Sequence, residues 1–583
     1  MPIPRLADPA ESAPERTGPT EPFGSFPDPP TTARQRSRRP RPDPVLLAPA
    51  LVTFVVVSWK LSTPSYWRDE AATLDAEARS IPALLRMLTN VDAVHGVYYL
   101  LMWPLVHTFG TSEIALRLPS AVAMAAAAGG VAALGRRLHS ARAGLLAGLV
   151  FAVLPQVSRY GQEGRSYALV LACAVLASYL LIRAVAEPDR RWLVGYGGAI
   201  VALGLLNLFG LLLLAAHAIF LVACHRALLR RWLITAAVAG LPAVPVAVLA
   251  WRQRDQLAWL TAPDTDAPGD LTVWLAGSTG AVVLVSVLIG FGLRARPSLR
   301  ISVVPASPWT GAASAGSRIG PVSAGSWTSR ALVRLRIAAA LLRPRTSAPP
   351  AWLAQSRNAQ SWNARTWNAQ ARNAQTRNVR SGNALPWLAL PWLVAPPVLL
   401  LAAAELAIPV YTQRYVAFCL PALALPVGVG LAGITLAPRV LALLLIATLG
   451  LPTQLAQRQP DGHGDDIRAA ADILTAHEHP GDGVLYHCWS CHFPDTPREF
   501  AFAYPAAFAP LDDLALARSP SASNTLRGTE IDQPTLARRV ADANRVWLIE
   551  TGGSNEPPTV AESGMHQSAV YRAGDITVTL YER

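Results

Sequence analysis

Long blocks of apolar residues alternate with short polar segments over most of this chain. The blocks are about 16–25 residues long, the length that a helix needs to cross a hydrocarbon core of roughly 30 Å. The pattern therefore predicts a polytopic α-helical membrane protein with about eleven spans. The predicted spans lie near residues 45–59, 115–135, 143–157, 167–186, 192–208, 209–224, 233–250, 271–293, 385–406, 416–437 and 440–455.

Composition supports the membrane interpretation. Of the 583 residues, 52% are hydrophobic and only 15% are charged, whereas soluble domains carry roughly 25% charged residues. The formal net charge of +13 comes from arginines that lie mostly in the loops between apolar blocks. Because basic loops set the topology of membrane proteins, we expect the lipid bilayer as a partner and no nucleic acid.

The basic cluster Arg34–Arg41 directly precedes the first span. It predicts a cytoplasmic N-terminus in a multi-pass plasma-membrane protein. Residues 1–44 have no apolar core, so they are interpreted as a disordered basic cytoplasmic tail rather than a cleavable signal peptide. Residues 61–114 then form one large external loop. Its two short apolar stretches, 81–89 and 98–109, are expected to be interfacial helices.

The remaining boundaries follow from changes in composition. The membrane core comprises residues 45–293 and 384–456. Residues 294–383 between them are rich in Arg, Ser and Ala, contain a five-residue repeat and are interpreted as a low-complexity cytoplasmic insertion. From residue 457 to 583 the composition is that of a soluble protein. We expect a small extracytoplasmic α/β domain there.

The expected elements of this C-terminal domain alternate between helix and strand. Helices are predicted at 467–477 and 535–543, and strands at 483–487, 545–550 and 576–581.

Two cysteines and two histidines are crowded into His487–His492 of that domain. An oxidising compartment favours a disulfide between Cys488 and Cys491. Zinc binding and free thiols are the alternatives, although the spacing is too short for the usual tetrahedral zinc site. No metal site is therefore assigned from these residues.

The predicted topology brings three polar segments to the outer face: Asp69 with Glu70, residues 159–167, and residues 411–415. Arginine binds phosphate with a planar fork of donors. A carboxylate can take a proton from a hydroxyl or ligate a divalent cation such as Mg²⁺ or Mn²⁺. This mixture suits an anionic, lipid-linked substrate. The alternative is a set of solvated loop residues without a role in chemistry.

Short motifs at the span boundaries occur in an order that resembles the bacterial GT-C glycosyltransferases. This group of polyprenyl-phosphate-sugar-dependent enzymes includes protein O-mannosyltransferases and lipid A aminoarabinose transferases. The motifs are Trp67–Ala71, His95–Leu100, Phe109–Glu113, Arg117–Ser120, Gln162–Leu169 and Arg414–Tyr415.

The resemblance implies a role for each motif. Asp69 would be the general base, with Glu70 and Glu163 as further catalytic carboxylates that orient substrate or hold a cation. Residues that would bind the donor phosphate or another part of the substrates complete the set. These residues are Arg165, Arg414 and His95 for the phosphate, and Arg68, Tyr167 and Tyr415 for the substrates.

One motif departs from the family pattern. Related sequences often have His-Pro-Pro where this chain has His95-Gly96-Val97, so the loop around His95 is expected to differ in shape.

The implied activity is transfer of a sugar, with inversion, from a polyprenyl-phosphate donor to a protein or glycolipid acceptor outside the membrane. Mannose is the expected sugar, and arabinose or another pentose is the alternative within the same fold. A transporter or flippase of lipid-linked sugars and an inactive glycan-binding scaffold are the alternatives from other classes. A transporter would place its charged groups near the midplane of the bilayer, and these spans are largely Ala, Leu, Val and Gly.

Overall fold

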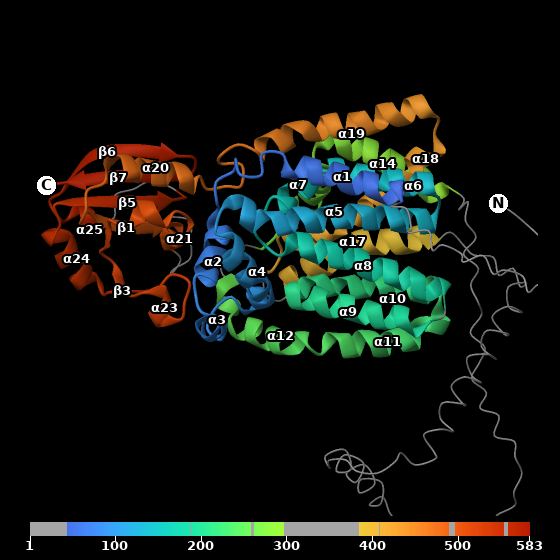
Figure 1. Ribbon diagram of the computed structural model, residues 1–583, viewed down its shortest axis with the longest axis horizontal. Coiled ribbons are helices and arrows are strands. Elements are labelled where there is room, and N and C mark those ends of the chain that lie inside the picture. Colours follow the sequence, from blue (N-terminus) through green and yellow to red (C-terminus); the bar gives the residue numbers. More distant parts are fainter. Residues whose placement is uncertain are drawn as a thin grey trace, which may run out of the picture. The chain divides into compact units, whose positions relative to one another are not determined.

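The computed structural model describes residues 43–187, 189–257, 260, 262–295, 384–406, 409–488, 496–552 and 558–583. Residues 1–42 of the predicted tail and residues 296–383 of the insertion lie outside these residues. Residues 43–583 form one unit, in which a helical bundle and a sheet-containing domain follow each other along the chain (Figure 1).

Helices occupy every predicted span. The helices of this part are α1 (Pro44–Ser58), α2 (Arg68–Glu77), α3 (Ile81–Leu88), α4 (Gly96–Phe109), α5 (Glu113–Leu138), α6 (Ala141–Val153), α7 (Pro155–Gly161), α8 (Tyr167–Ala186), α9 (Arg190–Leu206), α10 (Leu213–Cys224), α11 (Arg226–Gly240), α12 (Ala243–Arg252), α13 (Ala267–Ala276), α14 (Thr279–Arg294), α17 (Ala384–Leu406), α18 (Leu420–Gly433) and α19 (Leu436–Ala456).

Among the described residues, five helices are long and apolar enough to cross a membrane: α5, α8, α17, the segment Gln413–Gly433 that includes α18, and α19. Three bent pairs raise this number to eight if each pair is one span. The helical membrane fold is thus confirmed, while the count of eleven stays a prediction.

The bends have local causes. The 67° bend between α6 and α7 occurs at Pro155, which cannot donate a backbone hydrogen bond and disfavours helical geometry in the residue before it. The 80° bend between α13 and α14 occurs at Gly277, whose φ of +95° favours glycine. A Cβ at Gly277 would also lie 2.7 Å from Cγ of Pro155, so the two breaks pack against each other.

Small residues allow the central helix α18 to approach its neighbours closely. A Cβ at Gly430 would lie 2.2 Å from the carbonyl oxygen of Leu288 on α14, and one at Gly292 would lie 2.0 Å from that of Pro426 on α18. Only glycine permits such a backbone approach, which is typical of helices packed within membranes.

Segments predicted to lie on the inner face contact each other at one end of the bundle, and segments predicted to lie on the outer face contact each other at the other end. At one end, Arg136 pairs with Asp43, and Nη2 of Arg137 lies 3.8 Å from Oε1 of Glu187. At the other end, the side chain of Gln162 donates to the carbonyl of Val57 at 2.7 Å. The first four predicted spans, formed by α1, α5, the pair α6–α7 and α8, therefore alternate in direction as predicted.

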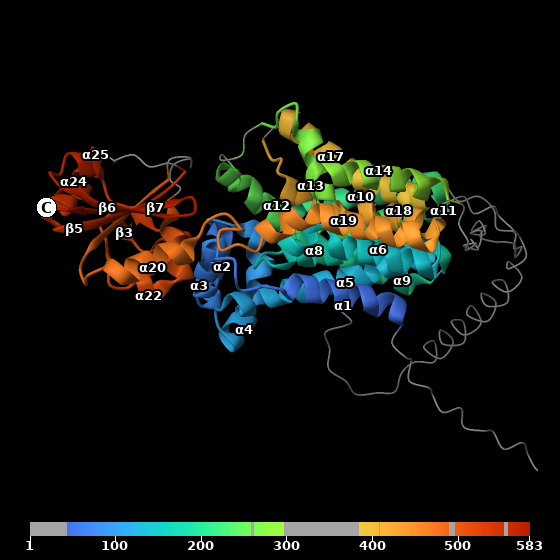
Figure 2. The same cartoon turned by 90° about the horizontal axis from the view of Figure 1, so that it is seen from above.

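The segment predicted to be the first external loop forms helices α2, α3 and α4 at the second end of the bundle (Figures 1 and 2). The two interfacial helices predicted at 81–89 and 98–109 correspond to α3 and α4. Helix α2, which begins at Arg68 and carries Asp69 and Glu70 in its first turn, was not predicted. Acidic residues are favoured in the first turn of a helix because the backbone N–H groups there are positively polarised.

The C-terminal domain contains a five-stranded sheet in the order β2-β1-β5-β7-β6. Strands β1, β2 and β5 are parallel, and β7 runs antiparallel to β5 and β6. The strands and helices are α20 (Ile467–His477), β1 (Gly483–Cys488), α21 (Phe500–Ala503), α22 (Pro505–Phe508), β2 (Asp512–Asp513), β3 (Leu516–Arg518), α23 (Pro520–Ser523), β4 (Thr529–Glu530), α24 (Gln533–Asp542), β5 (Arg545–Thr551), α25 (Pro558–Ala561), β6 (His566–Ala573) and β7 (Ile576–Glu582).

This domain confirms the predicted helices at 467–477 and 535–543 and the three predicted strands within one or two residues. Strand β6 and several short elements were not predicted. Cys488 is the last residue of β1 and is disulfide-bonded. Cys491, its predicted partner, lies outside the described residues, so that pairing stays a prediction.

Candidate active site

The carboxylate of Asp69 lies between two arginines from distant parts of the chain. Its Oδ2 is 3.1 Å from Nη1 of Arg414 and 3.9 Å from Nε of Arg165. The side chain remains 24% exposed, so a substrate can reach it. The three outer segments predicted to share one face therefore meet at Asp69.

The charges around Asp69 determine its protonation state. Burial by itself would raise the pKa of this carboxyl group, but Arg414 and Arg165 outweigh burial and hold the pKa below its ordinary value. Asp69 is thus an anion at neutral pH, and two cations face it.

Arg165 is fixed by several acceptors. Its Nη1 donates to the hydroxyl of Tyr99 at 3.0 Å, to Oγ1 of Thr73 at 3.2 Å and to the backbone carbonyl of Asp69 at 3.3 Å. Tyr99 in turn donates to the carboxylate of Asp92. The guanidinium is therefore pre-oriented beside Asp69, as binding of a phosphate oxygen requires.

Aromatic rings surround the second cation. The guanidinium of Arg414 lies 5.8 Å from the ring centroids of both Trp67 and Tyr415, and Tyr415 stacks on Phe209 at 4.8 Å. Arg159 approaches the ring of Trp67 at 5.3 Å. Cation–π contacts of this kind orient arginine without neutralising its charge.

Glu163 reaches this group through Arg159. It is only 1% exposed, and its Oε2 lies 3.5 Å from Nη1 of Arg159. Neither carboxylate oxygen has a hydrogen-bond partner among the described residues. Burial raises the pKa of Glu163 to about 7, so the group is poised to take or release a proton near neutral pH.

Glu70 differs from the expected catalytic role. Its carboxylate and the guanidinium of Arg117 are both completely buried. Arg117 donates to Oε1 at 2.9 Å and to Oε2 at 2.6 Å, and the backbone N–H of Gly164 donates to Oε1 at 2.7 Å. Glu70 therefore joins α2 to α5 and to the loop of Arg165, and it has no exposed surface for a substrate.

His95 is a neutral, largely buried side chain beside Asp92 and Arg165. Burial, followed by the positive charge of Arg165, lowers the pKa of His95 to about 4. Its Nε2 lies 3.9 Å from Oδ1 of Asp92. A neutral imidazole can exchange one hydrogen bond with a phosphate but supplies no positive charge to it, so the predicted role of His95 stays a prediction.

Two further predicted substrate residues lie within electrostatic range of Asp69 but contact other side chains. Tyr167 is buried against Tyr160, with ring centroids 5.2 Å apart. Arg68 faces the C-terminal domain, where its Nη2 donates to Oγ1 of Thr551 at 3.0 Å. Arg68 therefore contacts a different domain from its neighbour Asp69.

Sequence reasoning assigned no role to Arg117, Arg159, Trp67 or Tyr99. Each lies within or beside a motif, but only the fold shows what the side chain faces. A signal was present for Arg117, because an arginine within an apolar helix requires a buried partner.

The donor set fits an anion better than a divalent cation. Each of the three predicted catalytic carboxylates faces an arginine: Asp69 has Arg414, Glu70 has Arg117 and Glu163 has Arg159. Across the described ranges, three or more His, Cys, Asp or Glu side chains do not come together as ligands for one ion. Because arginine repels metal ions and cannot ligate them, we derive no step through Mg²⁺ or Mn²⁺.

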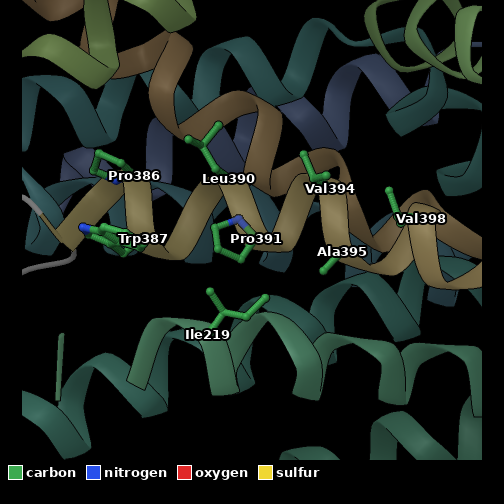
Figure 3. Close-up of a pocket in the computed structure, with 8 residues that line it drawn as sticks. All are labelled: Ile219, Pro386, Trp387, Leu390, Pro391, Val394, Ala395 and Val398. Carbon is green, nitrogen blue, oxygen red and sulfur yellow. The ribbon is translucent and has the colours of Figure 1, made fainter. Parts of the chain in front are cut away.

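An apolar groove of about 420 Å³ runs between α10 and α17 (Figure 3). Its lining includes Ile219 on α10 and Leu390 and Val394 on α17. A second groove of about 300 Å³ lies between α17 and the pair α13–α14, and it shares Val394 and Val398 with the first. Both grooves consist almost entirely of aliphatic side chains and prolines.

Comparison with known proteins supports the resemblance. Residues 96–251 match the family model described as dolichyl-phosphate-mannose-protein mannosyltransferase. This segment contains Arg117, Glu163 and Arg165, whereas Asp69 and Arg414 lie outside it. The match confirms the resemblance to the polyprenyl-phosphate-dependent glycosyltransferases.

Two solved structures are similar in fold. ArnT from Cupriavidus metallidurans, bound to undecaprenyl phosphate, is 14% identical over 92% of this chain and 97% of its own, with a TM-score of 0.47. The oligosaccharyltransferase of Archaeoglobus fulgidus is 12% identical over 86% of this chain and 69% of its own, with a TM-score of 0.38. No curated protein matches the sequence.

Proposed function

We propose that this chain is a membrane glycosyltransferase that moves a sugar from a polyprenyl-phosphate donor to an acceptor hydroxyl on the extracytoplasmic side of the membrane. The observation that carries the proposal is the partly exposed carboxylate of Asp69 between Arg165 and Arg414. The match of residues 96–251 to mannosyltransferases supports the choice of reaction and favours mannose.

The chemistry requires one base and one anion-binding group. The acceptor oxygen attacks the anomeric carbon while the bond from that carbon to the donor phosphate oxygen breaks. The acceptor proton passes to Asp69, and polyprenyl phosphate leaves with the bonding electrons. A single displacement of this kind inverts the anomeric centre. Arg165 and Arg414 are placed to stabilise the charge that develops on the phosphate.

Arg414 has two partners in this scheme. Without substrate it pairs with Asp69 at 3.1 Å, which keeps the carboxylate weakly basic. A donor phosphate would compete for the same guanidinium. Donor binding would therefore release Asp69 and raise its pKa, which makes it a stronger base only when the sugar is present.

The polyprenyl tail needs an apolar surface that leads to the phosphate site. The grooves beside α17 supply such a surface, and α17 leads to the segment that carries Arg414. We assign the tail to these grooves. The basic residues Arg136 and Arg137 lie at the opposite end of the bundle from Asp69, which favours an extracytoplasmic active face and a cytoplasmic N-terminus.

The test is transfer of radiolabelled mannose from polyprenyl-phosphate-mannose to a membrane acceptor fraction by the purified protein. We expect Asp69→Asn to lower the rate by about 10²–10⁴-fold, the usual contribution of a general base. Asp255→Asn is the matched control, because Asp255 is an exposed carboxylate of the outer segment after α12. Transfer by Asp69→Asn at the rate of the control would remove Asp69 from this role. Efficient use of a pentose donor in place of mannose would correct the sugar but not the reaction.

A further inference from the structure

The C-terminal domain contacts the chain near both ends of α2, the helix that carries Asp69. At the start of α2, Nη2 of Arg68 donates to Oγ1 of Thr551 at 3.0 Å, and its Nε lies 3.5 Å from Oε1 of Glu499. Just after α2, Arg79 donates to the carbonyl of Pro520 at 3.2 Å and to that of Thr525 at 2.6 Å.

The segment before α2 is held in the same way. Arg468 of α20 donates to the carbonyls of Ser62 and Thr63, each at 3.0 Å, and pairs with Glu113 at 2.7 Å. The hydroxyl of Tyr504 accepts from the backbone N–H of Tyr66 at 3.3 Å. These contacts leave α2 little freedom to move independently of the C-terminal domain.

Arg68 contacts the C-terminal domain at the ends of two of its strands. Thr551 and Cys488 are the last paired residues of β5 and β1. After β1 the chain continues to β2, on one side of these two strands, and after β5 it continues to β6, on the other side. The carboxyl ends of two such strands form the crevice where open α/β sheets usually bind ligands. Both terminal nitrogens of Arg68 lie 4.0 Å from Sγ of Cys488, so the guanidinium lies at this crevice.

The partner carboxylate in the crevice is strongly constrained. Glu499 is 1% exposed and also accepts from Nε of Arg527 at 3.1 Å. Its Oε1 holds Arg68 through the ion pair alone, without a hydrogen bond among the described residues, and burial leaves this pair less screened by solvent than a surface pair. The contact between Arg68 and the C-terminal domain is therefore a defined anchor.

Asp69 follows Arg68 directly in the chain. Successive side chains of a helix point about 100° apart, so Arg68 reaches the C-terminal domain while Asp69 faces Arg165 and Arg414. A movement of Arg68 must move Asp69, because both belong to the first turn of α2. A shift of about 1 Å at a reacting group can cost about 10²-fold in rate.

We propose that Arg68 is a positioning residue, held by Thr551 and Glu499, through which the C-terminal domain sets the position of Asp69. This inference rests on the proposed function for its kinetic consequence. It gives the C-terminal domain a task in the reaction without any contact between that domain and the sugar. The domain acts as a rigid support for the base.

The test compares Thr551→Val with Thr535→Val in the full-length protein. Both changes remove a threonine hydroxyl that accepts from arginine, since Arg538 donates to Oγ1 of Thr535 at 3.1 Å. Thr535 lies in α24 and makes no hydrogen bond to α2 among the described contacts. Two measurements are made: transfer kinetics with polyprenyl-phosphate-mannose, and hydrogen–deuterium exchange of the α2 amides.

For Thr551→Val we expect kcat to fall by about 10–100-fold and the exchange of α2 to increase. KM for the donor should stay within about twofold, because the change leaves Arg165 and Arg414 in place. Thr535→Val should match the wild type in every measurement. Arg68→Met should reproduce Thr551→Val, and Arg68→Lys should restore part of kcat.

The two proposals fail in different ways. Exchange of α2 that is the same in the wild type and Thr551→Val overturns the positioning role, whether or not the protein transfers sugar. Increased exchange with unchanged kcat also overturns it, as does a fall in kcat that is matched by loss of donor affinity. A wild type that transfers no sugar overturns the proposed function, and the exchange measurement then decides whether Arg68 anchors α2.

Discussion

Removal of the Arg117 side chain should destabilise this protein more than removal of any partly exposed arginine in the same helix. Arg117 is completely buried and donates five hydrogen bonds. Two go to the carboxylate of Glu70, and three go to backbone carbonyls of the segment before α2. Arg117→Met keeps most of the length of the side chain and removes every one of these donors.

The magnitude follows from the burial of the pair. Without Arg117 the Glu70 carboxylate keeps, of the donors in the described part of the chain, only the N–H of Gly164, so a buried charge is left without a counter-ion. Loss of one partner of a buried ion pair costs about 3–5 kcal/mol. The double variant Arg117→Met with Glu70→Gln removes the charge as well. We therefore expect it to recover about 0.5–3 kcal/mol relative to the sum of the single variants.

The assay is chemical unfolding of the detergent-solubilised protein, with sugar transfer measured in parallel. Arg137→Met is the matched control, because Arg137 lies in the last turn of the same helix and its contact with Glu187 is 3.8 Å long and partly exposed. That change should cost no more than about 1 kcal/mol. Equal stability of Arg117→Met and Arg137→Met would refute the conclusion that the buried contacts of Arg117 with Glu70 and the segment before α2 stabilise the protein.

Three further outcomes are expected. In pH–rate profiles, the acidic limb of kcat should lie at higher pH than that of kcat/KM. Bound donor phosphate should pair with Arg414 in place of Asp69 and so raise the pKa of the Asp69 carboxyl group. Acidic limbs at the same pH would contradict this exchange of partners. In thermal unfolding, Glu77→Gln should stabilise the protein at pH 8 and not at pH 4. Burial raises the pKa of Glu77 from 4.5 to about 8, so the wild-type protein loses stability as pH rises through this window, and glutamine does not ionise. Val394→Trp should fill the grooves beside α17 and raise KM for the donor while kcat stays constant, and Val440→Trp on the exposed face of α19 should change neither.

The membrane fold could be predicted from the sequence because each span must satisfy its own backbone hydrogen bonds and therefore needs a long apolar block. The bends were harder to predict. Pro155 and Gly277 are visible in the sequence, but their mutual contact determines how two apolar blocks become bent pairs. In the C-terminal domain, β6 escaped prediction because its residues His566–Ala573 are mostly polar and exposed, so they lack the alternation of a half-buried strand.

The convergence of Asp69, Arg165 and Arg414 could be predicted because the order and direction of the spans place their loops on one face. The anchor contacts could not be predicted in this way. Arg68 and Thr551 are separated by 483 positions, and nothing in either segment indicates the other. Such pairs depend on how the C-terminal domain docks, which the apolar pattern does not specify.

The sequence motif does not distinguish the environments of Asp69 and Glu70, whereas their positions on α2 give the two carboxylates different surroundings. Because they are consecutive residues in the first turn of α2, one carboxylate can face Arg165 and Arg414 while the other faces the interior of the bundle. The buried position requires a dedicated counter-ion, and Arg117 supplies it. That counter-ion makes Glu70 a poor base, since its protonation would break a buried ion pair. The exposed position has counter-ions that a phosphate can take. Of the two carboxylates, only Asp69 can therefore gain basicity when the donor binds.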